Sequence, residues 1–197
     1  MKYLALGDSY TIGEQIDFSE NFPNQLLSRL INEKKDNSIL LKLIAKTGWT
    51  TDELIEAIKN DTFEDKYNYI SLLIGVNNQY RKYPINIFKK EFLFLLDFIE
   101  KLKKERKNVF IFSIPDWSYT PFAENNEKHP NPKITSDEIK IYNEFIKQET
   151  DKRKFTYIDI FKLSQNQGKE NPKKYLTKDK LHYSKEAYLE WIKLIKF

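Results

Sequence analysis

The first residue that could do chemistry is Ser9, which stands in the sequence Gly7-Asp8-Ser9 directly after an apolar run. A serine hydroxyl is a weak nucleophile at neutral pH, and it attacks a carbonyl only beside a general base that takes its proton. The same residues could instead form a plain turn and helix start, with Asp8 or Ser9 as the cap. The sequence also lacks the second glycine of the Gly-x-Ser-x-Gly elbow, which argues against an α/β-hydrolase fold. The role of Ser9 therefore depends on which base the chain supplies.

His182 is the better candidate for that base among the two histidines of the chain. Asp179 precedes it by three residues, so its carboxylate can accept a hydrogen bond from the ring nitrogen that faces away from Ser9. Such a partner selects the tautomer of the histidine and stabilises the imidazolium that forms during attack. The alternative is a capping aspartate and a surface histidine ahead of a helix. The other histidine, His129, stands next to Pro130 in a long loop, where we expect an exposed loop residue.

Attack on an ester places negative charge on the carbonyl oxygen, and hydrogen-bond donors aimed at that oxygen stabilise the transition state. The candidate donors are the backbone N–H groups of Ser9 and Gly48 and the side-chain amide of Asn77. Glycine lets the backbone approach a ligand closely, and asparagine offers an uncharged donor. Gly48 could equally be a turn glycine, and Asn77 could be a loop residue that tolerates unusual backbone angles.

The elements that must position these residues are strands and helices in alternation. Short runs rich in aliphatic and aromatic residues without strict polar alternation predict parallel strands that are covered on both faces. Helical spacing of apolar residues occurs between Phe88 and Leu102 and again between Tyr188 and Ile195, and a capping box at 50–53 and Ser184 are helix start signals. The predicted strands are Lys2 to Leu6, Ile39 to Ala45, Tyr69 to Ile74, Val109 to Ile114 and Phe155 to Ile160. This alternation predicts an α/β fold, a three-layer α/β/α sandwich, in one domain over residues 1–197.

The candidate site residues all follow predicted strands. Because ligands of parallel α/β sheets bind at the carboxyl ends of the strands, we expect these residues to meet at one edge of the sheet. The segment 115–133 contains four prolines and no periodic pattern, and a loop of that length is usually functional or mobile. Its Trp117, Tyr119 and Phe122 could line a substrate pocket or simply pack beneath the loop.

Composition excludes several classes of protein. The formal net charge is +4, and the lysines of "KKEFLFLLDFIEKLKKERK" alternate with acidic residues, which indicates a solvated surface and no nucleic-acid partner. The chain has no cysteine, so disulfides, zinc–thiolate sites and a cysteine nucleophile are excluded. No apolar stretch is long enough to insert stably in a membrane, and no secretory signal stands before the first strand. From these features we expect a cytoplasmic location.

Four blocks in this order, "LALGDSYTIGE", "KTGWTTDEL", "LLIGVNNQYR" and "DKLHYS", resemble the SGNH hydrolase family, also called GDSL esterases and lipases. The resemblance covers nearly the whole chain. It places the nucleophile of the family on Ser9, the oxyanion-hole donors on Ser9, Gly48 and Asn77, and the remaining triad residues on Asp179 and His182. It implies a flavodoxin-like, five-stranded parallel sheet in the order 2-1-3-4-5, no metal, no cofactor, and hydrolysis through an acyl-enzyme.

Two positions depart from the pattern of this family. The third block usually reads Gly-x-Asn-Asp, but this chain has Asn78 at the last position, a change that we expect to alter the support of the loop and to leave the donor Asn77 in place. Tyr183 stands where a proline is frequent and could loosen the turn after His182. Asp8 belongs to the first block, and we interpret it as a residue that braces the loop and not as the triad acid.

The sequence therefore predicts a serine hydrolase that acts on a small-molecule carboxylic ester. A carbohydrate acetylesterase, a thioesterase and a lysophospholipase are alternatives within the same family, since one fold supports all of these activities. Alternatives of a different class are a non-catalytic flavodoxin-like module that binds phosphate or flavin, and an inactive relative retained for interaction. The pair Asp179 and His182 argues against the binding module, because a phosphate cradle does not need it. The sequence leaves the oligomeric state open.

Overall fold

A computed structural model describes residues 1–197, apart from the side chain of Asn125. Five strands form one sheet in the order β2-β1-β3-β4-β5, and every neighbouring pair is parallel. The predicted fold class and strand order are therefore confirmed. The strands are β1 Lys2–Gly7, β2 Leu40–Ala45, β3 Tyr69–Leu73, β4 Val109–Phe112 and β5 Thr156–Ile158.

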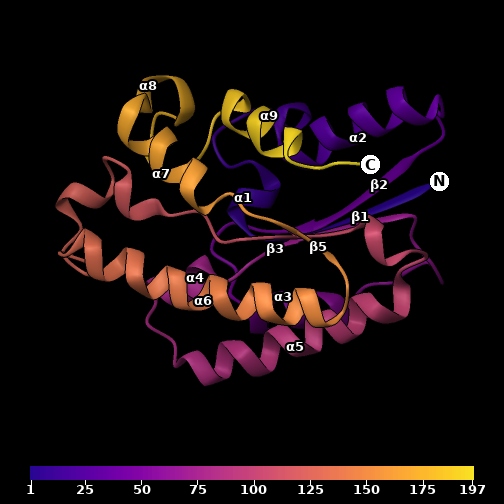
Figure 1. Cartoon of the computed structure of the whole chain (residues 1–197), viewed down its shortest axis with the longest axis horizontal. Coiled ribbons are helices and arrows are strands. Elements are labelled where there is room, and N and C mark those ends of the chain that lie inside the picture. The colour runs from indigo at the N-terminus through magenta and orange to yellow at the C-terminus, as the bar shows by residue number, and fades with distance from the viewer.

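Helices cover both faces of the sheet and give the expected three layers (Figure 1). In this view α2 and α9 lie on one side of the sheet, and α3, α5 and α6 lie on the other. The α-helices are α1 Ser9–Ile12, α2 Phe22–Lys34, α3 Thr51–Lys59, α4 Val76–Tyr80, α5 Ile85–Leu102, α6 Pro132–Lys152, α7 Phe161–Glu170, α8 Pro172–Tyr175 and α9 Lys185–Lys193. Short 3-10 helices are η1 Phe18–Glu20, η2 Arg106–Asn108, η3 Trp117–Tyr119 and η4 Ala123–Asn125.

The central strands are buried on both faces, which explains their nearly continuous apolar sequences. Every residue of β3 and β4 is buried, whereas the edge strand β2 begins with the exposed Leu40. The helical stripe of α5 faces the core through Phe88, Phe92, Leu95, Leu96 and Ile99. Burial of these large side chains supplies the main stabilising term of the sandwich.

The predicted helix starts are present. The backbone N–H of Thr50 donates to the Glu53 carboxylate at 2.9 Å in the capping box of α3. The Ser184 hydroxyl accepts from the backbone N–H of Ala187 at the start of α9. Asn131 caps α6 in the same way, and Pro132 occupies its first turn, so this helix begins inside the segment that the sequence assigned to a loop.

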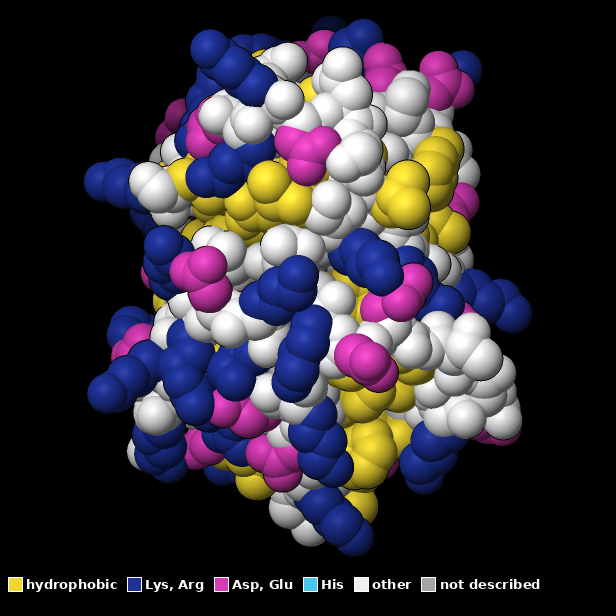
Figure 2. All heavy atoms as spheres, turned by 90° about the vertical axis from the view of Figure 1, so that its right-hand side faces the viewer, with side chains coloured by type: hydrophobic (Ala, Val, Ile, Leu, Met, Phe, Trp, Pro, Cys, Tyr) yellow, Lys and Arg dark blue, Asp and Glu magenta, His cyan; other side chains and the backbone are white. Residues whose placement is uncertain are grey.

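The end of the sheet where the chain termini lie is strongly charged (Figure 2). Figure 2 shows many lysine and arginine side chains on this face with acidic side chains among them. Glu100 pairs with Lys103 at 3.0 Å and with Arg106 at 2.5 Å, and Glu105 pairs with Lys107 at 3.2 Å. Ion pairs thus account for part of the lysine-rich segment before β4. None of the helices in the described part of the chain combines the length and apolarity that a membrane crossing requires.

Candidate active site

Ser9 lies where the central strand β1 passes into the short helix α1. Asp8 caps this helix, because its carboxylate accepts the backbone N–H of Tyr10 at 3.0 Å. Gly7 is required at the end of the strand, since a Cβ atom there would lie 2.0 Å from the Thr11 hydroxyl oxygen and 2.3 Å from the Leu73 carbonyl oxygen. The sharp turn therefore brings the backbone close to β3 and places Ser9, which is 5% exposed, at the carboxyl edge of the sheet.

The structure brings Ser9 and His182 together although 173 positions separate them in the chain. His182 Nε2 lies 2.9 Å from Ser9 Oγ, and His182 Nδ1 lies 2.6 Å from Asp179 Oδ2. An ionised carboxylate can only accept, so the Nδ1 hydrogen points to Asp179 and Nε2 is left to accept the hydroxyl proton of Ser9. This is the arrangement in which a histidine acts as the general base for a serine.

Asp179 is fixed by the turn that carries His182. Its Oδ1 atom accepts the backbone N–H groups of Leu181 at 2.9 Å and His182 at 3.0 Å, and the Thr177 hydroxyl at 2.8 Å. Burial by itself would raise the pKa of Asp179, but these hydrogen bonds and the one from the His182 ring outweigh burial and lower the pKa to about 2. The carboxylate is therefore ionised throughout the neutral pH range.

The turn after His182 is not loosened by Tyr183. The backbone N–H of Thr177 donates to the His182 carbonyl at 2.8 Å, and Tyr183 pairs with Leu176 in an antiparallel bridge. The Tyr183 ring is fully buried and packs against Tyr10, with ring centroids 5.5 Å apart. The large aromatic side chain thus anchors the turn on the helix that carries Ser9, contrary to the expectation from the missing proline.

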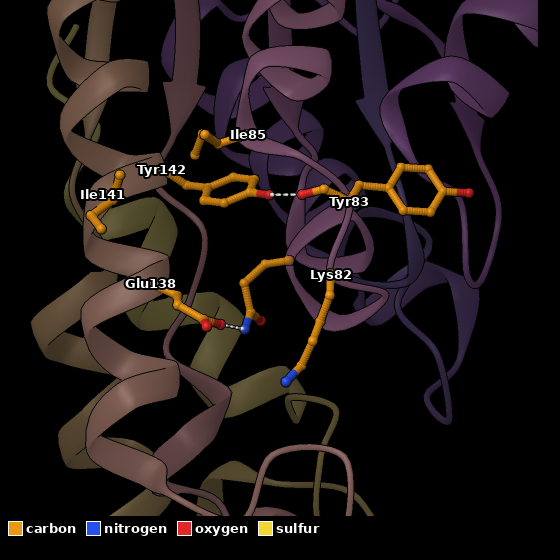
Figure 3. A pocket seen from close by; sticks show the side chains of 7 residues that line it. Lys82, Tyr83, Ile85, Glu138, Ile141 and Tyr142 are labelled. Carbon is orange, nitrogen blue, oxygen red and sulfur yellow. Dashed lines mark hydrogen bonds between the residues drawn. The ribbon is translucent and has the colours of Figure 1, made fainter.

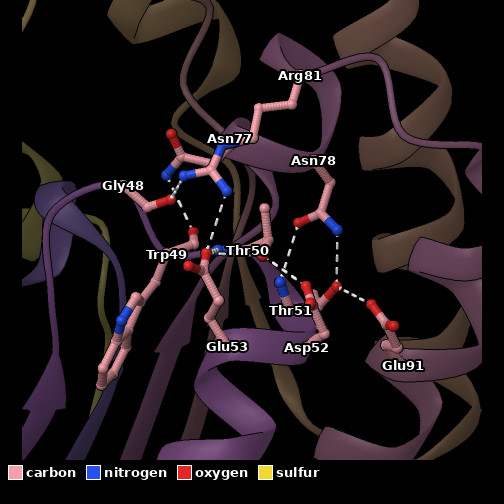
Figure 4. Close-up of polar contacts among 10 residues, drawn as sticks. All are labelled: Gly48, Trp49, Thr50, Thr51, Asp52, Glu53, Asn77, Asn78, Arg81 and Glu91. Carbon is pink, nitrogen blue, oxygen red and sulfur yellow. Dashed lines mark hydrogen bonds and ion pairs between the residues drawn. The ribbon is translucent and has the colours of Figure 1, made fainter.

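Gly48 and Asn77 line the same cavity as Ser9 and His182. Gly48 has φ +84°, a left-handed conformation that favours glycine. Asn77 Nδ2 donates to the Trp49 carbonyl at 3.0 Å, and Arg81 donates to the Gly48 carbonyl at 2.6 Å, as Figure 4 shows. The carbonyls of Gly48 and Trp49 are therefore held by side chains of α4 and of Arg81, the residue that follows it. An amide nitrogen carries two hydrogens, so Asn77 Nδ2 can still donate to a second acceptor.

Asn78 supports the same turn from behind, as expected for its position. Its side chain accepts the backbone N–H of Thr51 at 3.1 Å and donates to the Thr51 hydroxyl at 2.8 Å. The Thr51 hydroxyl in turn donates to Glu91 of α5, so one directed chain of hydrogen bonds links α4, α3 and α5 (Figure 4). Sequence analysis missed Arg81, Thr51 and Glu91, because their partners are remote in the chain.

The cavity above Ser9 has a volume of about 180 Å³. Trp117 and Phe122 of the proline-rich segment line it and also pack on the hydrophobic core, whereas Tyr119 does not line it and is 37% exposed. The cavity is lined by Ser9, Tyr10, Thr47, Gly48, Val76, Asn77, Tyr80, Trp117, Phe122, Leu181 and His182. Larger openings occur on the surface, but this one contains the polar groups that converge on a nucleophile.

His129 is buried and not exposed, so the expectation for this residue was wrong. It is 4% exposed, and its Nε2 atom lies 2.9 Å from the Tyr80 carbonyl oxygen. Its ring also packs on the rings of Tyr80 and Trp117. The residue does not line the cavity and has no hydrogen bond with Ser9, whereas His182 contacts Ser9 directly.

Asp8 is the other buried acid beside Ser9. Its Oδ2 atom is buried and has no hydrogen-bond partner within the described residues. Burial raises the pKa of this carboxyl to about 7, although the backbone N–H of Tyr10 acts in the opposite direction. Through the hydrogen bond from Tyr10, Asp8 braces the turn that carries Ser9, as expected. Among the described residues, no group of three or more His, Asp and Glu side chains is arranged to hold a metal ion.

A serine, a histidine and an aspartate in contact at the carboxyl edge of a parallel sheet form the arrangement that serine hydrolases use. Residues 5–189 match the GDSL-like Lipase/Acylhydrolase family, and the chain belongs to this family. It is a carboxylic ester hydrolase, as the sequence predicted.

Individual relatives are distant in sequence. The spore germination lipase LipC of Bacillus licheniformis is 24% identical in an alignment of 207 positions that spans 95% of this chain and 91% of that protein. Among solved structures, an acetylxylan esterase from Geobacillus stearothermophilus has a TM-score of 0.72 at 17% identity, over 100% of this chain and 94% of the other. A lipase from a goat rumen metagenome has a TM-score of 0.76 at 20% identity, over 100% and 98% of the two chains. At these identities the structures show the shared fold.

Proposed function

We propose that the protein hydrolyses carboxylic esters with Ser9 as nucleophile, His182 as general base and acid, and Asp179 as the residue that orients and stabilises His182. The observation that carries this proposal is the continuous contact from Asp179 through His182 to Ser9, at 2.6 Å and 2.9 Å. The family membership supports the reaction class.

In the first half of the reaction Ser9 Oγ attacks the ester carbonyl carbon while His182 Nε2 takes the hydroxyl proton. The tetrahedral intermediate collapses when the bond to the alcohol oxygen breaks, and His182 gives its proton to that oxygen. The acyl group is then bound to Ser9 Oγ. In the second half His182 removes a proton from a water that attacks the acyl carbon, and the same proton returns to Ser9 as the acid leaves.

Negative charge on the carbonyl oxygen is stabilised by the backbone N–H groups of Ser9 and Gly48 and by Asn77 Nδ2. The contacts of Asn77 with Trp49 and of Arg81 with Gly48 keep these donors in place before the substrate arrives. Preorganised donors of this kind contribute about 3 kcal/mol each to the stabilisation of the transition state.

The test uses a fluorophosphonate, which forms a covalent bond only with an activated serine. We expect intact-mass analysis to show one adduct, mapped by peptide analysis to Ser9, and Ser9→Ala to lose both the adduct and hydrolysis of 4-nitrophenyl acetate while it remains folded. Ser28→Ala, which changes an exposed serine on α2, is the matched control and should retain both. Hydrolysis by Ser9→Ala at the wild-type rate would refute the proposal.

A further inference from the structure

Behind the cavity above Ser9, three rings contact one another and form what we call the aromatic wall: Tyr80, Trp117 and His129. Tyr80 and Trp117 line the cavity, with ring centroids 5.5 Å apart, whereas His129 does not reach it. The His129 ring stacks on Tyr80 at 5.2 Å and meets Trp117 edge-on at 5.1 Å. His129 therefore supports both lining rings from the side opposite the cavity.

Hydrogen bonds also hold the Trp117 ring and the backbone of Tyr80. The Tyr80 carbonyl can only accept, so His129 Nε2 carries a hydrogen and donates it over the 2.9 Å between them. Trp117 Nε1 donates to Gln79 Oε1 at 3.0 Å, and Gln79 Nε2 donates to Glu138 of α6 at 2.7 Å. The indole and the backbone of Tyr80 are thus each held by a buried polar side chain.

The outer side of this arrangement is also tied to α6. Figure 3 shows Glu138 and Tyr142 of this helix at a separate cavity of about 260 Å³, where the Tyr142 hydroxyl donates to the Tyr83 carbonyl at 3.3 Å. The turn after α4 cannot move outward without breaking these contacts. The aromatic wall is therefore braced by α6 on its outer side.

We infer that His129 is a positioning residue that sets the acyl-chain limit of the enzyme, and that the substrates are esters of short acyl groups, from acetyl to butanoyl. This inference rests on the proposed function. The cavity of about 180 Å³ is smaller than the roughly 300–1,000 Å³ of pockets that enclose larger ligands. In the direction of the aromatic wall, a longer chain would have to displace Tyr80 or Trp117, which are packed on each other and on His129.

The direction of the acyl group follows from the catalytic groups. The leaving alcohol oxygen must face His182 Nε2, which protonates it, and the carbonyl oxygen must face Asn77 and Gly48. Tyr80 follows Asn77 by three residues on the same short helix α4. Tyr80 and Trp117 line the same cavity as these groups, so we assign the remaining direction at the carbonyl carbon, toward the aromatic wall, to the acyl substituent.

The experiment measures kcat/KM for 4-nitrophenyl acetate, butanoate, hexanoate and octanoate. We expect the wild-type protein to prefer acetate and butanoate by at least about tenfold over hexanoate, because one methylene too many against a packed apolar wall costs a factor of about 10 or more. His129→Ala removes the ring and the donor to Tyr80, and it should raise the hexanoate-to-acetate ratio at least about tenfold. His129→Gln retains an N–H donor without the ring, so it should raise the ratio by less and provides a milder variant should His129→Ala not fold.

Leu30→Ala is the control for a general loss of stability, since Leu30 is fully buried on α2 away from the site. It should lower the melting temperature without changing the acyl preference. An unchanged ratio in folded His129 variants, or a wild-type protein that hydrolyses octanoate as well as acetate, would overturn this inference while leaving Ser9 labelling intact. Loss of labelling and of all hydrolysis in the wild-type protein would instead remove the proposed function and this inference together.

Discussion

The hydrogen-bond chain from Asn78 through Thr51 to Glu91 gives the most specific prediction, the effect of Asn78→Asp. Asn78 Nδ2 now donates to the Thr51 hydroxyl, and that hydroxyl gives its single hydrogen to Glu91. With aspartate at position 78, two carboxylates would face one hydroxyl, and one of them would lack a hydrogen. The aspartate would be fully buried, as Asn78 is, so its charge would have no solvent to compensate it.

The magnitude follows from the loss of one charged hydrogen bond in a buried place. An unsatisfied buried polar group costs about 1–3 kcal/mol and a buried charge costs more, so Asn78→Asp should lower the free energy of unfolding by about 3 kcal/mol at pH 8. Glu91→Gln alone should change it by less than about 1 kcal/mol, because the amide oxygen can still accept from Thr51. In the double variant the new side-chain amide at position 91 can donate to Thr51 and the hydroxyl can donate to the aspartate, so most of the loss should be recovered.

Urea unfolding of the four proteins, followed by circular dichroism, measures the coupling between the two positions in a double-mutant cycle. We expect a favourable coupling of about 2 kcal/mol. Additive effects of the two substitutions, or a single Asn78→Asp variant as stable as the wild-type protein, would refute the direction that we assign to the hydrogen bonds.

Two further predictions concern the catalytic edge of the sheet. Asn77→Ala should lower kcat for 4-nitrophenyl acetate by a factor of about 100–1,000 with little change in KM, because the donor acts on charge that develops in the transition state. A variant whose KM rises by a similar factor while kcat is unchanged would argue against this role. The pKa of Asp8 is raised by burial to about 7 in the folded protein, so the folded state keeps a proton that the unfolded chain has released above about pH 4. The free energy of unfolding of the wild-type protein, compared with that of Asp8→Asn, should therefore fall by on the order of 4 kcal/mol as the pH rises from about 4 to about 7. Urea unfolding of both proteins across this pH range measures the difference, and parallel pH profiles would contradict the prediction.

The fold was predictable because its signals are local. Each strand is an apolar run, and the sheet extends only as far as neighbouring strands can pair. Phe155 to Ile160 was predicted as a strand, but β5 covers only Thr156–Ile158, since the backbone N–H of Ile160 turns away to donate to the Ser113 hydroxyl. Such an end effect depends on a partner 47 positions away.

The candidate site also contains residues that local motifs predicted and a residue whose position depends on remote contacts. Ser9, Gly48, Asn77, Asp179 and His182 stand in short motifs, so their types and order were sufficient to select them. His129 carried a misleading local signal, a neighbouring proline in a loop without periodicity. Its burial is caused by Tyr80, 49 positions earlier, which supplies both a carbonyl acceptor and a ring. No local pattern encodes such a contact.

The contact between Ser9 and His182 across 173 positions also has a consequence for biosynthesis. Under the proposed mechanism, the nucleophile leaves the ribosome 173 residues ahead of its base. A nascent or prematurely terminated chain that stops before position 182 therefore holds a serine with the reactivity of an ordinary alcohol. Under this proposal, hydrolytic activity arises only when the segment that carries His182 docks beside Ser9.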